Sequence, residues 1–407
     1  MKKMCKKVVS LLLAAVMVLT MTAFASVVYA ADEDSVEADP NFKMGVILVG
    51  DETEGYSAAH IAGVKEAAKE LGLDDSQIIW KYKVPEDSSC YDAAIDLVGQ
   101  GCSLVIGNSY GHQTYLVQAA QEYPDVTFVS MTGDFAAISG CENFKNAFTN
   151  IYESRYVSGV VAGLKLKELM DAGTVTDPYV GYVGAYPYAE VVSGYTAFFL
   201  GLRSIVPTAH MDVTYTNSWF NITAEAEAAN MLMSRGCVII GQHADSTGAP
   251  SAVQAAHESG KDVYCVGYNV DMLSVAPDVA LTSAQNCWGV VYTELIKTAM
   301  DGGTFKTDYS YGFADDGVQI SALGSACAPG TEEKVAEVEG AIKDGSLHVF
   351  DTSTFTVNGA EVTTTASADL ENDYHGVEYI ADGYFHESEY ASAPAFAFRI
   401  DGITELQ

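Results

Sequence analysis

One strand-helix-strand pattern occurs twice in the chain, as GCSLVIGNSYGHQTYLVQAAQEYPDVTFVSMTGD at residues 101–134 and as GCVIIGQHADSTGAPSAVQAAHESGKDVYCVGYNVD at residues 236–271. The motif VQAA stands at equivalent places in both copies, at residues 117–120 and 253–256. Each copy consists of an apolar run of strand length, a polar loop, a helical pattern and a second apolar run. Two lobes built on one α/β plan explain this repeat, and a chance likeness between two generic strand-helix units is the alternative.

The same alternation continues on either side of the repeat. KMGVILVG at residues 43–50 precedes the helical pattern AAHIAGVKEAAKELG at 58–72, and YVGYVGAY at 179–186 precedes VVSGYTAFFLGLRS at 191–204. Strands that alternate with helices of this length predict parallel sheets with helices on both faces. The tail differs, because LHVFDTSTFTV, the turn dipeptide Asn358-Gly359 and AEVTTT predict a hairpin appended to one lobe.

The first thirty residues predict export. Four lysines precede the apolar run VVSLLLAAVMVLTMTAFASVVYA, which ends in small residues, so residues 1–30 match a signal peptide cleaved after Ala30. An uncleaved membrane anchor is the alternative, since about twenty apolar residues can span a bilayer. Cys5 precedes the apolar run, so a lipoprotein cysteine is not expected. Residues 31–42 follow as an acidic leader.

Charge and cysteine content exclude several classes of function. Without residues 1–30, which hold four lysines and no acidic residue, the formal net charge falls from −33 to about −37. Such a surface repels nucleic acid, which is therefore not an expected partner. Seven cysteines remain after Ala30, none in a CxxC spacing, so neither a complete disulfide framework nor a cysteine metal site is predicted.

In open parallel sheets, ligands bind at the loops that follow the carboxyl ends of the strands. These loops are rich in aromatic, amide and carboxylate side chains and poor in lysine and arginine. The candidate ligand-binding residues are Asp51, Tyr56, Asn108, Tyr110, Trp219, Gln242, His243, Asp245, Asn269 and Asp271. Aromatic rings stack on flat ligands, and amides and carboxylates pair with ring N–H, amino or hydroxyl groups. The expected ligand is a neutral or cationic ring compound, and no cofactor, metal ion or catalytic residue is predicted.

Two local motifs point to other chemistry. Residues 107–111 (GNSYG) match the G-x-S-x-G nucleophile elbow of α/β-hydrolases, which makes Ser109 a candidate nucleophile. The equivalent loop of the second copy, residues 241–245, has no serine, so a binding loop is the preferred interpretation. His243 and Asp245 alone do not make a metal site, and the glycines after the first strand do not form GxGxxG.

The order of segments resembles the basic membrane protein (BMP) family of ABC transporter substrate-binding proteins, which includes purine nucleoside and nucleobase receptors. The resemblance rests on GDETEGYSAAHIAGVKEA, FTNIYESRYVSGVVAGLK, GYVGAYPYAEVVSGYTAFFLGLRS, TNSWFN, IIGQHADS, VGYNVDM and LTSAQNCWG. It implies the type I periplasmic-binding-protein fold, with two Rossmann-like lobes joined by three crossovers. On that plan, residues 43–150 with 284–312 form lobe 1, and residues 151–283 with 313–407 form lobe 2.

The resemblance also implies a function. Trp219 would stack on a purine, with a second aromatic from the loops of Tyr56 or Tyr110, while Asp245 and Asp271 would contact the base. Nucleoside-binding members tend to carry a lysine shortly after the Thr-Ser of the last lobe-spanning strand, but here Thr282-Ser283 is followed by Ala284, Gln285 and Asn286. This departure favours a free base over a nucleoside.

We therefore expect an exported, monomeric solute-binding protein that delivers its ligand to ABC permease and ATPase subunits. A binding protein for a sugar, an amino acid or a signalling molecule that feeds a transporter or a sensor is the second hypothesis. A serine hydrolase is a remote third.

Overall fold

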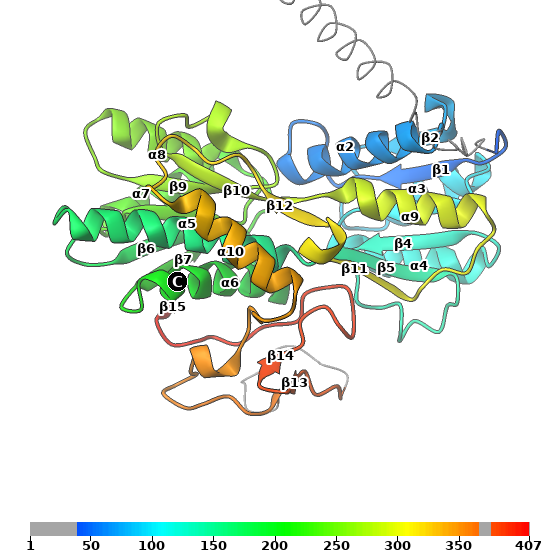
Figure 1. Ribbon diagram of the computed structural model, residues 1–407. Helices are drawn as coiled ribbons and strands as arrows, with labels where there is room; N and C mark the ends of the chain where they lie inside the picture. Colours follow the sequence, from blue (N-terminus) through cyan, green and yellow to red (C-terminus); the bar gives the residue numbers. More distant parts are fainter. Residues whose placement is uncertain (1–38, 366–375, 407) are drawn as a thin grey trace, which may run out of the picture. The chain divides into compact units, whose positions relative to one another are not determined.

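The computed structural model describes residues 39–365 and 376–406, so the predicted signal peptide lies outside the described residues. One sheet has six strands, all parallel to their neighbours (Figure 1). In spatial order they are β11 (Asp308–Tyr311), β5 (Phe144–Thr149), β4 (Thr127–Met131), β3 (Leu104–Gly107), β1 (Met44–Ile47) and β2 (Ile78–Lys81).

A second sheet has seven strands. In spatial order they are β12 (Val318–Ile320), β10 (Ala280–Asn286), β9 (Tyr264–Tyr268), β8 (Ile239–Gln242), β6 (Tyr179–Gly184), β7 (His210–Tyr215) and β15 (Ile403–Glu405). Only β12 runs antiparallel to its neighbour among these described strands, at one edge of the sheet. The predicted α/β class with parallel sheets is confirmed.

Helices cover both faces of each sheet, as the alternating pattern predicts. They are α2 (Gly55–Glu70), α3 (Ser89–Gly99), α4 (Gln113–Glu122), α5 (Ile151–Asp171), α6 (Ala189–Ile205), α7 (Ile222–Ser234), α8 (Gly248–Glu258), α9 (Trp288–Met300) and α10 (Thr331–Lys343). Short 3₁₀ turns are η1 (Asp75–Gln77), η2 (Tyr110–His112), η3 (Met272–Ser274), η4 (Phe313–Asp315) and η5 (Thr352–Thr354). In Figure 1, α9 lies beside α2 although more than two hundred residues separate them in the sequence.

Strand geometry explains why the runs are apolar throughout. Successive side chains on a strand point to opposite faces, and both faces of these sheets are covered. On β1, Val46 belongs to the apolar cluster that contains Ile61 and Val64 of α2, whereas Ile47 belongs to the cluster that contains Leu97 of α3. The second sheet packs against α5 and α6, which contact each other closely.

The C-terminal segment, residues 347–406, departs from the predicted hairpin. The turn at Asn358-Gly359 forms, with φ of 52° and 76°, but among the described residues only one bridge, Val357 to Ala360, flanks it, and η5 lies in the middle of the expected first strand. Its two-stranded antiparallel pair lies later, at β13 (Ile380–Ala381) and β14 (Tyr384–Phe385). The alternating side chains instead supply Phe350 and Phe355 to an aromatic cluster of this segment. β15 then joins the second sheet, parallel to β7.

All seven cysteines after Ala30 are free thiols in the described structure. Burial raises the pKa of Cys237 and Cys265 to about 12, so both remain neutral, as expected for small buried apolar residues. Among the described helices, none is both long and apolar enough to cross a membrane.

Candidate ligand-binding site

A cavity of about 970 Å³ is lined by loops that follow strands of both sheets. Tyr110 and Thr132 come from the six-stranded sheet, after β3 and β4. Tyr188 and His243 come from the seven-stranded sheet, after β6 and β8. This is the edge at which parallel sheets bind ligands, and the volume lies at the upper end of the usual range for small-molecule sites.

Half of the predicted site residues line this cavity. They are Tyr56, Tyr110, Trp219, His243 and Asp245. The other half do not: Asp51, Asn108, Gln242, Asn269 and Asp271. Their side chains form hydrogen bonds or ion pairs with other protein groups, within one loop or between neighbouring loops.

Asp51 and Asp271 stabilise turns near the surface. Asp51 forms an ion pair of 2.6 Å with Lys83, whose hydrogen bond lowers the pKa of Asp51 to about 2. Asp271 is exposed and accepts a hydrogen bond from the backbone N–H of Leu273 at 2.9 Å, which caps η3.

Asn108 and Gln242 are buried and hold loop backbone in place, Asn108 that of the neighbouring loop after β1 and Gln242 that of its own loop. The Asn108 side-chain oxygen accepts from the N–H of Val49 at 2.8 Å. Gln242 donates through Nε2 to the carbonyl oxygens of Ala244 and Ser246, at 2.7 and 3.0 Å. Both amides satisfy buried backbone groups that would otherwise lack partners.

The aromatic wall of the cavity consists of Tyr110, Tyr188 and Trp219. The Tyr110 and Tyr188 ring centroids lie 6.0 Å apart, and Tyr188 lies 6.0 Å from Trp219. Tyr186 packs behind them, 5.1 Å from Trp219. Tyr110 and Tyr188 keep 37 % and 46 % of their surface exposed, so flat faces remain for a ligand to cover.

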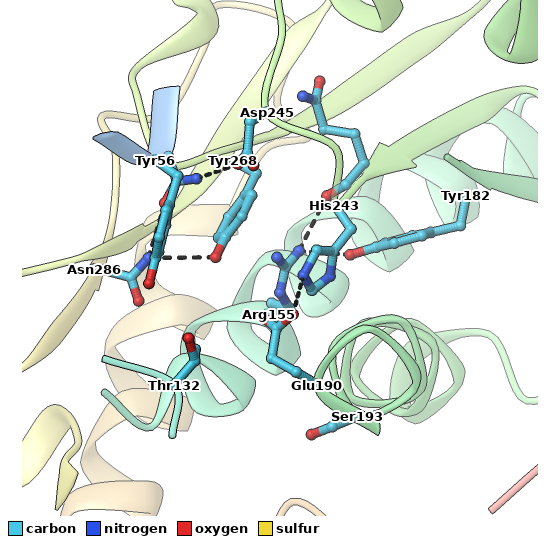
Figure 2. A network of polar contacts seen from close by, with 12 residues as sticks. Tyr56, Thr132, Arg155, Tyr182, Glu190, Ser193, His243, Asp245, Tyr268 and Asn286 are labelled. Atoms are coloured by element: carbon cyan, nitrogen blue, oxygen red, sulfur yellow. Dashed lines mark hydrogen bonds and ion pairs between the residues drawn. The ribbon is translucent and has the colours of Figure 1, made fainter. Parts of the chain in front are cut away.

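A buried charge network lies beside the aromatic wall (Figure 2). His243 Nε2 lies 2.7 Å from Glu190, which lines the cavity at the start of α6. Arg155 of α5 donates to the Tyr182 hydroxyl at 2.5 Å and to the Gln242 carbonyl at 3.0 Å. Figure 2 shows the Arg155 guanidinium next to the His243 ring.

This network sets the charges of its members. Burial, and after it the charge of Arg155, lowers the pKa of His243. Burial alone would raise the pKa of Glu190, but His243 and then Arg155 outweigh it and lower that pKa below its ordinary value. The Glu190 carboxyl group therefore ionises readily and faces the cavity as a carboxylate that is hydrogen-bonded to His243.

Asp245 is a second carboxyl group of the cavity, and its pKa is shifted in the opposite direction. Its side chain accepts from Asn269 Nδ2 at 2.6 Å. Asn269, a predicted site residue, therefore positions the Asp245 side chain and does not line the cavity itself. Burial, and then the neighbouring Glu54 and Glu225, raises the pKa of Asp245 well above its ordinary value. Asp245 therefore keeps its proton more readily than an ordinary aspartate, and it forms a hydrogen bond with the neighbouring Glu54 carboxyl group.

The nucleophile-elbow motif does not form a serine-histidine pair. The Ser109 hydroxyl donates to Glu86 at 2.7 Å. In His112, the nearest histidine in sequence, Nε2 pairs with the Val84 carbonyl at 2.9 Å and Nδ1 accepts from the Ser109 backbone N–H. Among the described residues, no three His, Cys, Asp or Glu side chains are grouped so that they could hold a metal ion.

Sequence reasoning missed several lining residues, including Thr132, Glu190 and Tyr268. Thr132 and Tyr268 lie at or just after the end of a strand, so the rule that gave the other candidates also indicates these positions, whereas Glu190 lies in the first turn of the helix after β6. Apart from Glu405 at the carboxyl end of β15, the lining residues of the C-terminal segment carry no such signal, because they do not follow a strand of either sheet. Among them, Arg399 adds a cation to a cavity whose predicted loops have almost none.

Comparison with known proteins identifies relatives with transport functions. Residues 44–346 match the family described as Bmp, ABC transporter substrate-binding protein PnrA-like. A purine-binding protein of Brucella abortus is 31 % identical over 318 residues, covering 78 % of this chain and 85 % of the relative. A Haloferax volcanii protein named for an ABC transporter and for glucose binding is 30 % identical, covering 67 % of this chain and 64 % of the relative.

Solved structures agree on the fold. A solute-binding protein of Aeropyrum pernix K1 superposes with a TM-score of 0.64 at 16 % identity, over 76 % of this chain and 93 % of that chain. One from Conexibacter woesei gives a TM-score of 0.60 at 20 % identity, over 75 % and 98 %. Both belong to ABC transporter systems, and substrate-binding proteins of ABC importers work outside the cytoplasm. The chain belongs to the Bmp family of ABC transporter substrate-binding proteins.

Proposed function

We propose that this protein captures a purine-like nucleobase, or a nucleoside, in the cavity and delivers it to the permease and ATPase subunits of an ABC importer. The observation that carries the proposal is the aromatic wall next to Glu190 and Asp245. A purine has a flat face for stacking and an edge that carries both N–H donors and ring-nitrogen acceptors. An ionised Glu190 accepts from the former, and a protonated Asp245 donates to the latter.

Capture is proposed to proceed by closure of two lobes, residues 43–150 with 284–312 and residues 151–283 with 313–407. The distribution of strands between the sheets supports this division, except that residues 284–286 complete β10 in the seven-stranded sheet. The chain passes from β5 to α5 near residue 150, from β10 to α9 after residue 283 and from β11 to β12 near residue 312. Hinge movement at such passages is a common way to enclose a ligand.

We further propose that residues 1–30 direct export, and that the protein acts as a monomer without catalysis. The engagement of Ser109 with Glu86 supports a binding role over hydrolysis. No turnover of an activated ester, in wild type or in Ser109→Ala, is the expected result, and turnover that Ser109→Ala removes would restore the hydrolase hypothesis.

A sugar is the second candidate ligand. The Haloferax volcanii relative is named for glucose binding, and aromatic side chains also pack against the apolar faces of sugars. A thermal-shift screen of purine bases, nucleosides, sugars and amino acids separates the candidates. Stabilisation by purines alone is expected, whereas stabilisation by glucose alone contradicts the proposal.

Substitution at the aromatic wall tests the assignment of the site. Trp219→Ala removes a stacking face and should weaken purine binding by at least about tenfold, or about 1.4 kcal/mol, in titration calorimetry. Tyr82→Ala is the matched control, because Tyr82 is an exposed aromatic residue that stacks on Trp80 outside the cavity. Equal affinity in wild type and Trp219→Ala would remove Trp219 from the site.

A further inference from the structure

The C-terminal segment lies beyond the family match, which ends at residue 346, yet it lines the cavity. Its aromatic side chains pack on one another as part of the main apolar cluster. The Phe350 and Phe396 rings stack at 4.2 Å, and Phe385 meets both Phe396 and Phe398 edge to face, at 5.1 and 5.6 Å. A segment with a packed core presents a defined surface to its surroundings.

Contacts to the six-stranded sheet fix one part of this segment. The Ser392 N–H donates to Asp308 at 2.9 Å, and the Ser388 carbonyl accepts from Ser310 at 2.9 Å. Asp308 and Ser310 both belong to the edge strand β11.

Contacts to the seven-stranded sheet and to α6 fix the other part. Glu387 accepts from the Ser193 hydroxyl of α6 and from the backbone N–H groups of Ala395 and Phe396, the latter two at 2.9 Å each. β15 pairs with β7. The segment therefore contacts elements of both sheets and forms one wall between them.

This wall combines small apolar residues with one ion pair. Ala391, Ala393 and Phe398 line the cavity. Arg399 lies 3.1 Å from Glu405, and both also line it. The Glu405 carboxylate further accepts from the hydroxyls of Tyr195 and Tyr215, at 2.6 Å each. Apolar surface and hydrogen-bonding groups thus lie side by side, as in small-molecule sites.

We infer that the C-terminal segment is part of the ligand site and sets how large a ligand fits, by contacting a hydroxyl-bearing substituent on the ring that the aromatic wall holds. This inference rests on the proposed function. A cavity of about 970 Å³ has room for more than a bare bicyclic ring. Ala391 and Ala393 leave that room because their side chains are short.

The test fills the space beside this wall and leaves the aromatic wall intact. Ala391→Trp and the milder Ala391→Leu are compared with Ala381→Trp, which adds the same bulk at an exposed alanine of the same segment outside the cavity. Adenine and adenosine are titrated by calorimetry against all variants and wild type. Thermal denaturation of each variant reports whether the segment still folds.

The expected result is a graded loss of adenosine affinity, at least about tenfold in Ala391→Trp and smaller in Ala391→Leu, with adenine less affected and Ala381→Trp unchanged. Wild-type adenosine affinity in both Ala391 variants overturns the inference and leaves the proposed function intact if Trp219→Ala still loses binding. If wild type binds neither adenine nor adenosine, both this inference and the proposed function are wrong.

Discussion

Asp245 shows how burial selects the charge of a binding residue. Because its pKa is raised well above the ordinary value, its neutral form is favoured, and an amide mimics that form more closely than a carboxylate does. Its partner Asn269 donates to it from the neighbouring loop after β9.

Substitution at Asp245 should distinguish a role of the protonated carboxyl group from a role of the ionised carboxylate. Asp245→Asn keeps an acceptor for Asn269 and a donor for the ligand, so we expect purine affinity within about threefold of wild type, or about 0.6 kcal/mol. Asp245→Ala leaves the buried Asn269 amide without its acceptor, at a cost of about 1–3 kcal/mol in stability, and it also removes the donor to the ligand. Calorimetry and thermal denaturation at pH 7 measure both, and equal loss of binding in the two variants would show that the ionised acid is needed.

Glu190 should behave in the opposite way. Glu190→Gln keeps an oxygen for the His243 hydrogen bond but loses the charge, so ligands that donate N–H groups should bind about tenfold more weakly, or about 1.4 kcal/mol. Because the pKa of Glu190 lies below its ordinary value, its contribution is present at neutral pH and is lost only as the solution is acidified through that low pKa. Ligand titrations between pH 8 and pH 5 should show no loss of affinity in wild type that is absent in Glu190→Gln.

The site was predictable in part at this scale. Strand ends indicate which loops meet, and so Tyr56, Tyr110, Trp219, His243 and Asp245 were found. Residue type does not indicate whether a polar side chain faces the cavity or forms hydrogen bonds with nearby loop backbone. Asn108 and Gln242 have the right chemistry and the right position in the chain, but backbone groups close in space already use them.

At the scale of elements, the contact between α5 and α6 positions the charge network, since α5 carries Arg155 and α6 carries Glu190. The two helices approach so closely that a Cβ atom on Gly159 would lie 2.0 Å from the Phe198 carbonyl oxygen. A Cβ on Gly201 would lie 2.0 Å from the Tyr156 carbonyl oxygen.

Alanine at this contact should separate the helices. Gly159→Ala is expected to lower the free energy of unfolding by about 1–3 kcal/mol through overpacking, and to weaken ligand binding by displacing Arg155. Gly340→Ala is the matched control, because Gly340 lies in α10 with open space around it, and helix propensity should make that variant about 0.5–1 kcal/mol more stable. Chemical denaturation compares them, and equal stability of Gly159→Ala and wild type would contradict the close contact.

Most strands of the two sheets were predictable because each is an apolar run next to a helical pattern, whereas polar residues interrupt β5, β11, β12 and β15. The C-terminal segment was not predictable, because its residues alternate as in a strand but pack their aromatic side chains on one another and into the main apolar cluster. Phe350 illustrates this, since it packs on Phe396, a residue far along the chain that local periodicity does not reveal.

At the scale of the whole molecule, Glu387 links the C-terminal segment to α6 in a pH-dependent way. Burial, only partly offset by Ser193 and the backbone N–H groups, raises the pKa of Glu387 from 4.5 to about 7. The folded state therefore binds a proton that the unfolded chain releases, and stability falls as the pH rises from about 4.5 to about 7. One pKa unit is worth about 1.4 kcal/mol, so the effect amounts to a few kcal/mol.

Glu387→Gln should remove this loss. The amide oxygen can accept from the N–H groups of Ala395 and Phe396, and the Ser193 hydroxyl, which donates to Glu387, can rotate to accept from the NH₂ group. The stability of Glu387→Gln relative to wild type should increase between pH 5 and pH 8 in thermal denaturation. Glu361→Gln, at an exposed residue of the same segment, is the control. A stability difference between Glu387→Gln and wild type that is the same at every pH would contradict the prediction.

The pairing of β15 with β7 has a consequence for the behaviour of the protein in concentrated solution. Without β15, the six-residue strand β7 would end the sheet with a row of unpaired backbone N–H and C=O groups, an open template for strands of other molecules. Residues 403–405 occupy that template within the same chain. Loss of these three residues is therefore expected to convert a monodisperse protein into one that self-associates through its sheets, which light scattering would detect as growing particles.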